Sequence, residues 1–271
     1  MITSTKPGRR ERLLFALLTA GSLFAACPTP VGAMHIMEGY LPASHCIVWG
    51  AICVPFLAWG IWRVTKLTKE RRKLMLILAM TGAFIFVISS LKIPSVTGSC
   101  SHMTGTGLAA ILFGPTVATV LGIIVLVFQA LLLAHGGITT LGANTFSMAI
   151  AGPLLSFGLY KLNQKMHMNQ KVNLFLAAAL GDLFTYCVTS FQLALAHPSA
   201  GTGVWGSAVK FLGVFAPTQV PLAAIEGILT VLIVMGLQKV AGEEMDLLHM
   251  GRPQEKGGAV DETETDEAED A

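Results

Sequence analysis

The sequence has few charged residues, and this scarcity excludes most water-soluble folds. Asp, Glu, Lys and Arg make up 13% of the 271 residues, whereas a typical soluble domain carries about a quarter. Hydrophobic residues make up 53% of the chain, and the charges gather in short clusters between long apolar runs. This distribution predicts an all-α fold, a polytopic bundle of transmembrane helices.

Several signatures of other protein classes are also absent. The chain has no GxxxxGK[ST] nucleotide-binding motif and no HExxH metalloprotease motif, so we expect no ATPase activity, no other enzyme activity and no cofactor. The five cysteines show no CxxC spacing and give no indication of a disulfide framework. The net charge of +2, without a basic stripe, gives no indication of a nucleic-acid partner.

The N-terminus has the features of a secretory signal peptide. The apolar run 13–26 is too short to span a bilayer comfortably, and Val31-Gly32-Ala33 places a small residue directly before Met34. A basic cluster precedes the run: Lys6, Arg9, Arg10 and Arg12. We predict a signal peptide over 1–33. The alternatives are an uncleaved first helix and lipoprotein-type processing at Cys27.

Cleavage after Ala33 would create a chelating chain end. Met34 would gain a free amine with a pKa near 8. That amine, the backbone nitrogen of His35 and the His35 imidazole can close two fused rings on one metal ion. A further imidazole completes a square of nitrogens that suits Ni(II) or Cu(II), and Co(II) is another candidate. Met37 is a nearby extra donor. On these adjacent residues alone, the favoured interpretation of His35 is an ordinary interfacial histidine.

The apolar runs predict seven helices after signal removal, with the N-terminus outside and the C-terminus inside. The basic connection after the first helix is expected to be cytoplasmic by the positive-inside rule. The third helix is short, and if it were re-entrant every later side would flip. The predicted segments are 44–66, 74–93, 104–114, 116–134, 144–162, 172–196 and 209–238. They form one membrane domain, 34–240, followed by an acidic, disordered cytoplasmic tail, 241–271.

Polar residues stand out at two kinds of position. His102 and His135 lie in glycine- and hydroxyl-rich loops predicted on the outer face. Asp182 and Glu226 lie inside predicted helices, where charge usually has a function. They either relay ions or pair with Lys210, Gln192 or Gln219. The remaining histidines are assigned no role in capture: His45, His167, His197 and His249.

Five motifs resemble the CbiM/NikM family, the substrate-capturing S components of energy-coupling factor transporters for cobalt and nickel. They are MHIMEGYLP at 34–42, SLKIPSVTGS at 90–99, SH at 101–102, GTG at 105–107 and QALLLAHGG at 129–137. The resemblance covers about residues 34–240. The last motif and the preceding signal are more similar to the cobalt branch, CbiM.

This resemblance implies a capture mechanism and a set of partners. Met34, His35 and His102 would hold Co(II) or Ni(II). Asn144 is a candidate to support the ligands by hydrogen bonds, and His135 is either such a support or simply a loop residue. The partners implied are the membrane scaffold CbiQ, the ATPase CbiO and the small membrane subunit CbiN, in a bacterial or archaeal cell membrane, supplying cobalt for cobalamin biosynthesis. Binding should weaken at low pH because the nitrogens must shed protons. The alternative is an autonomous metal channel or secondary transporter that uses Asp182 and Glu226.

Overall fold

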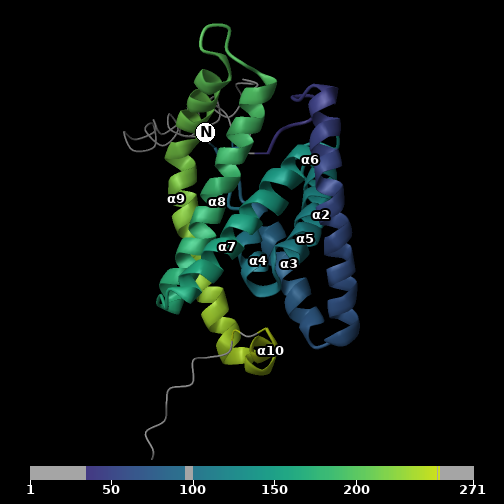
Figure 1. The fold of residues 1–271 in the computed structure, drawn as a ribbon, viewed down its shortest axis with the longest axis vertical. Coiled ribbons are helices and arrows are strands. Elements are labelled where there is room, and N and C mark those ends of the chain that lie inside the picture. Colours follow the sequence, from purple (N-terminus) through teal and green to yellow (C-terminus); the bar gives the residue numbers. More distant parts are fainter. Residues whose placement is uncertain (1–34, 95–99, 249, 251–271) are drawn as a thin grey trace, which may run out of the picture.

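Helices account for most of the computed structural model, which describes residues 35–94, 100–248 and 250 (Figure 1). The helices are α2 (Ala43–Glu70), α3 (Leu74–Ser90), α4 (Thr106–Phe113), α5 (Pro115–Leu132), α6 (Leu141–Asn144), the π-helix η1 (Thr145–Ala151), α7 (Gly152–Lys165), α8 (Gln170–Ala196), α9 (Gly203–Val240) and α10 (Gly242–Leu247). Two short antiparallel strands, β1 (Ile93–Pro94) and β2 (Cys100–Ser101), pair between α3 and α4. The predicted signal peptide, Met34 and most of the predicted tail lie outside the described residues.

The predicted transmembrane helix bundle is confirmed. The helices α2, α5, α8 and α9 are long and apolar enough to cross a membrane, and α3 is a shorter apolar helix. Each of the seven predicted segments has a helical counterpart. The segment predicted at 144–162 is a longer rod in which α6, η1 and α7 follow one another without a break.

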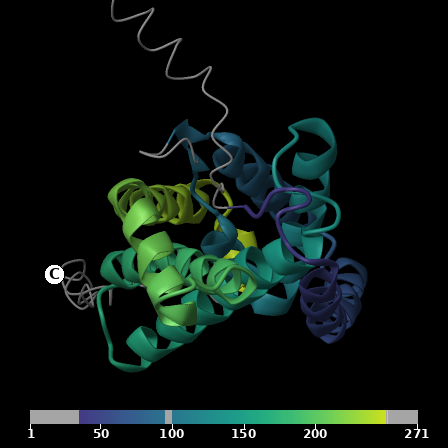
Figure 2. The same cartoon turned by 90° about the horizontal axis from the view of Figure 1, so that it is seen from above.

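The helices differ in how much of their surface the protein covers. Only 11% of the most apolar stretch of α2 is buried, whereas 56% of the corresponding stretch of α8 is buried. In agreement, α2 lies at the edge of the bundle in both views of the ribbon (Figures 1 and 2). A helix that is apolar on all sides but poorly covered is suited to face lipid. The inner helices α8, α9 and η1 are the ones that surround the buried polar groups described below.

The short helix α4 and the connection before it fill the interior of the bundle. All eight residues of α4 are buried, and eight helical residues extend only about 12 Å, too little to cross a bilayer. The preceding residues Ser101–Gly105 are not helical and are also buried. Gly105 has φ +69°, and a Cβ there would lie 2.8 Å from Ile88 Cδ1. The connection predicted as an outer loop therefore enters the protein and carries His102 with it.

The folded part of the chain extends beyond the predicted boundary at residue 240. Helix α10 forms over residues that the sequence assigns to the tail, and its Met245 is fully buried in the core cluster around Leu74 and Val234. Lys73 Nζ lies 3.1 Å from Glu243 Oε2 and ties α10 to the start of α3. The tail was predicted from charge alone, and one buried methionine among acidic residues gives little sequence signal.

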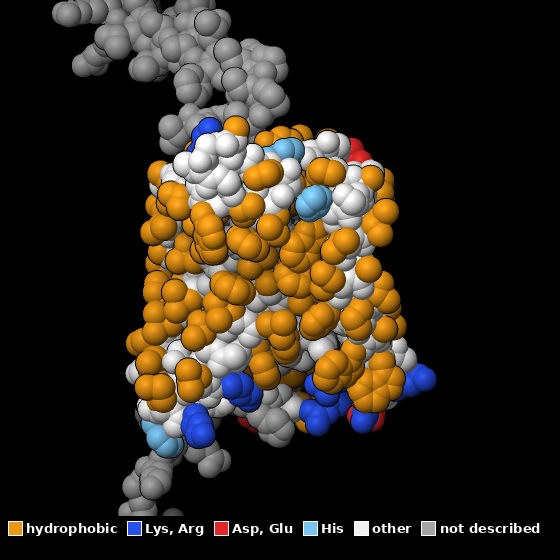
Figure 3. Space-filling model, turned by 45° about the horizontal axis from the view of Figure 1, so that its top comes forward, with side chains coloured by type: hydrophobic (Ala, Val, Ile, Leu, Met, Phe, Trp, Pro, Cys, Tyr) orange, Lys and Arg blue, Asp and Glu red, His pale blue; other side chains and the backbone are white. Residues whose placement is uncertain are grey.

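Charged and titratable side chains divide between the two ends of the molecule. In the space-filling view, most lysines and arginines gather at the lower end, while histidines appear near the upper end and also at the lower left (Figure 3). The sides between them are mostly hydrophobic. This segregation is typical of a protein whose middle is surrounded by lipid. We call the lower end the basic end and the upper end, which carries the candidate site described below, the site end.

Candidate metal centre

Three histidines from distant parts of the sequence meet near the site end. His35 precedes α2, His102 lies between β2 and α4, and His135 follows α5. One potential ligand nitrogen from each lies within 4.8 Å of the others, and all three side chains are buried. Among the described residues, this is the group of histidine, cysteine and acidic side chains that is arranged to hold a metal ion.

Two of the imidazoles face each other through nitrogen atoms. His35 Nδ1 lies 2.5 Å from His102 Nε2. His102 Nδ1 lies 2.8 Å from the carbonyl oxygen of Met103, and since a carbonyl only accepts, Nδ1 carries the proton and Nε2 has the free lone pair. In His35, Nδ1 is the ring nitrogen nearest to the backbone nitrogen of the same residue. His35 Nδ1 and His102 Nε2 are therefore the two ring atoms that the predicted chelate requires.

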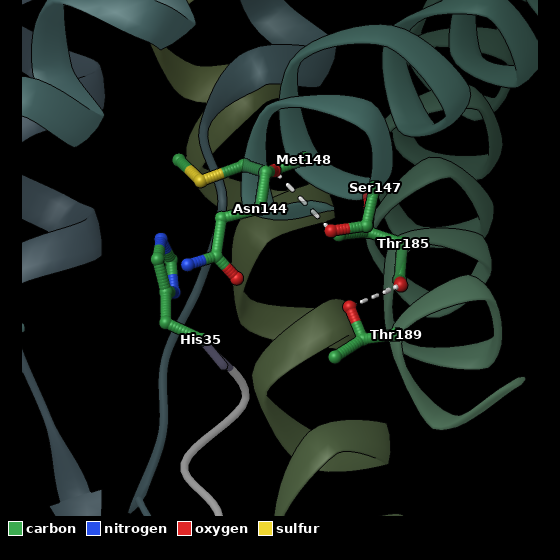
Figure 4. Close-up of a pocket in the computed structure, with 6 residues that line it drawn as sticks. All are labelled: His35, Asn144, Ser147, Met148, Thr185 and Thr189. Carbon is green, nitrogen blue, oxygen red and sulfur yellow. Dashed lines mark hydrogen bonds between the residues drawn. The ribbon is translucent and has the colours of Figure 1, made fainter. Parts of the chain in front are cut away.

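The segment after His35 is held by side chains of the helical rod. Asn144 binds both polar groups of the Ile36 backbone: Ile36 N donates to Oδ1 at 2.8 Å, and Nδ2 donates to the carbonyl at 3.0 Å. Thr140 Oγ1 donates to the same carbonyl at 2.6 Å. Figure 4 shows Asn144 extending toward His35. It directly precedes the π-helix η1, a rare element that is frequent at functional sites.

Asn144 therefore acts differently from the sequence prediction. It was expected to support the histidines by hydrogen bonds, but its own hydrogen bonds reach the Ile36 backbone and Thr140. The hydroxyl groups of Ser147 and Thr189, which line the same pocket, also make no hydrogen bond to the His35 ring (Figure 4). Ser147 donates to the Asn144 carbonyl at 3.2 Å, and Thr189 donates to the Thr185 carbonyl at 3.1 Å. Each hydroxyl is used within its own helix.

The N-terminal segment has further anchors that the sequence did not reveal. His197, to which we assigned no role, places Nε2 2.8 Å from the Tyr40 carbonyl. Thr139 N donates to Glu38 Oε2 at 3.2 Å, and hydrogen bonds from Thr139 lower the pKa of that exposed carboxyl group. A Cβ at Gly137 would lie 2.6 Å from Glu38 Cα. Only glycine permits this close approach of the two segments.

The two buried acidic residues hold the His102 segment from below. Glu226 on α9 accepts from Thr104 N at 2.6 Å, from Gly105 N at 2.9 Å and from Thr104 Oγ1 at 3.0 Å. It therefore satisfies buried N–H groups at the start of α4. Gln219 donates to Asp182 Oδ2 at 2.6 Å and to the His102 carbonyl at 3.3 Å. The predicted pairing of Asp182 with Gln219 is confirmed.

Burial keeps the three imidazoles neutral. Desolvation lowers the pKa of His102 to about 4 and, together with repulsion from His102, that of His135 to about 2. The pKa of His35 is also lowered, first by burial and then by its neighbours His102 and His135. A cluster of neutral imidazoles with free lone pairs in a site that excludes water is suited to a divalent cation.

Comparison with known proteins identifies the family. Residues 35–244 match the family model CbiM, described as the cobalt uptake substrate-specific transmembrane region. The chain belongs to the CbiM family. It is 62% identical over 238 residues to a cobalt transport protein CbiM of Lachnoclostridium phytofermentans, covering 88% of this chain and 95% of the relative. A CbiM of a Nostoc species is 50% identical over 92% of this chain and 96% of its own.

Solved structures agree with this assignment. A crystal structure of a transition metal transporter has a TM-score of 0.67 and 30% identity, covering 79% of this chain and 96% of that one. A truncated form has a TM-score of 0.66 and 28% identity over 76% of this chain and 99% of its own. The chain is therefore a multi-pass membrane protein and a cobalt uptake component, not an enzyme, as the CbiM motifs predicted.

Proposed function

We propose that this CbiM-family chain captures Co(II), or Ni(II), at the site end and is the substrate-binding membrane subunit of an ATP-driven energy-coupling factor importer. The observation that carries the proposal is the pair of facing nitrogens, His35 Nδ1 and His102 Nε2, 2.5 Å apart. They come from residues separated by 67 positions. In the metal-free protein one proton shared between the two nitrogens satisfies both, and a divalent cation that displaces this proton would bind both lone pairs.

The ion would be held by a planar set of nitrogens. After processing at Ala33, the Met34 amine, the His35 amide nitrogen and the His35 imidazole would supply three of them, and His102 the fourth. The hydrogen bonds of Asn144 and Thr140 to the Ile36 backbone support this assignment, because they hold the residue after His35 inside the protein. In the processed chain Met34 would directly precede His35, so its amine would belong to the same chelate as the His35 nitrogens.

Transport would require further subunits. The sequence has no nucleotide-binding motif of the P-loop type, so the proposed ATP hydrolysis belongs to a separate ATPase, CbiO. A membrane scaffold, CbiQ, would move the loaded subunit to open its site to the cytoplasm, and CbiN would be the small membrane partner. In this arrangement the imported Co(II) is used for cobalamin biosynthesis.

The alternative of autonomous transport through Asp182 and Glu226 is not favoured by their contacts. Both oxygens of Glu226 accept hydrogen bonds from the backbone of the His102 segment, whereas Asp182 accepts from Gln219 through Oδ2 alone. The Glu226 carboxylate, occupied in this way, is poorly placed to pass ions from one partner to the next. Reconstitution of the chain alone in liposomes separates the two functions, since only an autonomous transporter would take up Co(II) without an ATPase.

The direct test is Co(II) titration of the purified protein by calorimetry. His102→Ala should abolish high-affinity binding because it removes one ligand and leaves the other nitrogens an incomplete set. His45→Ala is the matched control, since this histidine lies at the same end of α2 but outside the cluster. Thermal unfolding of the metal-free variants checks that each is folded. Unchanged Co(II) affinity in folded His102→Ala protein would reject the proposed site.

A further inference from the structure

We propose that His135 is an additional nitrogen ligand of the captured ion and that it favours Co(II) over Ni(II). The inference rests on the proposed function, and it extends the planar set of four nitrogens to five. From the sequence alone we assigned His135 a weaker role, either as hydrogen-bond support or as a simple loop residue. Three features of the described structure argue for direct ligation.

The first feature is that the His135 ring is buried without a hydrogen-bond partner. Its side chain is 3% exposed, and neither Nδ1 nor Nε2 has a partner among the described residues. An unpaired buried polar group destabilises a fold by about 1–3 kcal/mol. His102, by contrast, uses both ring nitrogens. A ring that only supported another ligand would donate a hydrogen bond to it, and His135 makes no such bond.

The second feature is that the backbone places the ring in the cluster at the expense of strain. Helix α5 ends at Leu132, and Ala134 adopts φ +46°, a conformation that residues with a Cβ rarely take. His135 N then donates back to the Gln129 carbonyl at 3.1 Å. Gly136 follows at φ +79°, and a Cβ there would lie 3.5 Å from the His35 ring. Strain of this kind persists where a functional position requires it.

The third feature is the position of the ring relative to the other two. Its centroid lies 4.5 Å from that of His35 and 4.8 Å from that of His102, and its plane is tilted by 85° to His102. Met37, the other extra donor that the sequence offers, is 45% exposed. His135 is therefore the donor available beyond the planar set among the described residues near the cluster.

A fifth nitrogen changes which ion fits best. Four nitrogens in a square satisfy Ni(II) and Cu(II), which gain little from another ligand, whereas Co(II) readily takes five or six. Removing the His135 imidazole should therefore weaken Co(II) binding more than Ni(II) binding. Metal sites lose about 10- to 100-fold in affinity when a group that only supports a ligand is removed. Since His135 is proposed as a direct ligand, we expect a loss of at least this size for Co(II) and a smaller one for Ni(II).

The test compares wild-type protein with His135→Leu, with His45→Leu as the control outside the cluster. Leucine has a similar size and removes an unpaired polar group, so the metal-free variant should unfold at the same temperature as wild type or higher. X-ray absorption at the cobalt edge should find three imidazoles on Co(II) in wild type and two in His135→Leu, and calorimetry should show the selective loss of Co(II) affinity.

The outcomes separate the two proposals. Two imidazoles on Co(II) in wild-type protein would overturn ligation by His135 while leaving capture by His35 and His102 intact. Failure of wild-type protein to bind Co(II) would overturn the proposed function itself. If His135→Leu does not fold, the imidazole count in wild type still decides the matter. Equal losses of Co(II) and Ni(II) affinity would overturn the role in selectivity.

Discussion

Two buried polar groups lie next to each other in this protein and are treated in opposite ways. Glu226 is fully buried, and both of its carboxylate oxygens accept hydrogen bonds from the Thr104–Gly105 segment. The histidine cluster is equally buried, but His35 Nε2 and both ring nitrogens of His135 have no partner among the described residues. The acidic group is saturated by the protein, whereas the imidazoles are left open.

This difference separates support from function. A buried charge that is fully paired can stabilise one arrangement of the chain and is not free to bind anything else. Buried nitrogens without partners destabilise the empty protein and gain most from a ligand that supplies a positive charge. Glu226 therefore reads as the group that positions His102, and the three imidazoles as the group that binds. The predictions below test this division, beginning with the largest expected effect.

The largest effect should come from displacing the proposed amine ligand. One extra residue placed between Ala33 and Met34, and retained after cleavage, moves the amine out of its chelate ring with the His35 amide. We expect Co(II) affinity to fall by about 100-fold or more, equivalent to about 3 kcal/mol. Calorimetry of purified protein, after N-terminal sequencing to confirm the retained residue, measures the change.

The control for this extension is a substitution that leaves the chain end in place. Ala33→Gly keeps a small residue at the predicted cleavage site and should yield a mature protein that starts at Met34 and binds normally. If the extended protein bound Co(II) as tightly as the native one, the open cluster would consist of imidazoles alone, and the chain end would have no part in it.

A smaller effect is expected when the support is removed and the ligands are kept. In Glu226→Gln the amide group turns a donor toward Thr104 N or Gly105 N, so at least one buried N–H loses its acceptor. The free energy of unfolding should decrease by about 1–3 kcal/mol, and Co(II) affinity should fall about tenfold because His102 is held less firmly. Thermal unfolding and calorimetry of the same preparation report the two effects.

Two variants sharpen this second prediction. Glu243→Gln removes an exposed acidic side chain at the basic end and should leave Co(II) affinity unchanged. Asp182→Asn keeps an oxygen that accepts from Gln219, so it should change affinity less than Glu226→Gln does. The idea of a supporting role fails if Glu226→Gln binds Co(II) normally and yet stops uptake by the assembled transporter, since that result is expected of an ion path.

The membrane helices were predictable from sequence for a physical reason, and part of the proposed ligand set follows from a local motif. Long apolar runs determine where helices cross a bilayer, and they are read directly from composition. Met34-His35 is a local motif whose chelating ability needs no tertiary structure. His102 could be assigned only through the family resemblance, because nothing near it in the sequence shows that it meets His35.

The supporting contacts were beyond sequence reasoning because they join distant residues. Glu226 was recognised as unusual inside a helix, but its partner Thr104 is 122 positions away. Asn144 was predicted to form hydrogen bonds at the site, but with a histidine ring and not with the Ile36 backbone. The sequence does not decide between these partners, since a side-chain amide can bind either one. Gly136 and Gly137 were recognised as turn residues, yet their close contacts with the His35 and Glu38 region appear only in three dimensions.

The smallest effect concerns pH and the metal-free protein. Burial lowers the pKa of His102 to about 4, below its usual value near 6.5, so the folded protein favours the neutral ring. The unfolded chain takes up the proton first as pH falls, and the stabilisation present above about pH 6.5 is therefore lost progressively down to about pH 4. His135, whose pKa is lowered further, acts in the same direction.

The melting temperature of the metal-free protein should therefore decrease between pH 7 and pH 5, and His135→Leu should flatten this dependence because it removes one of the responsible groups. Each histidine contributes at most about 1.4 kcal/mol per pH unit. Glu226→Gln should lower the melting temperature at both pH values. If His135→Leu kept the full pH dependence, the lowered pKa of His135 would have no part in the stability of the empty cluster, and the contrast with Glu226 would rest on the ligand alone.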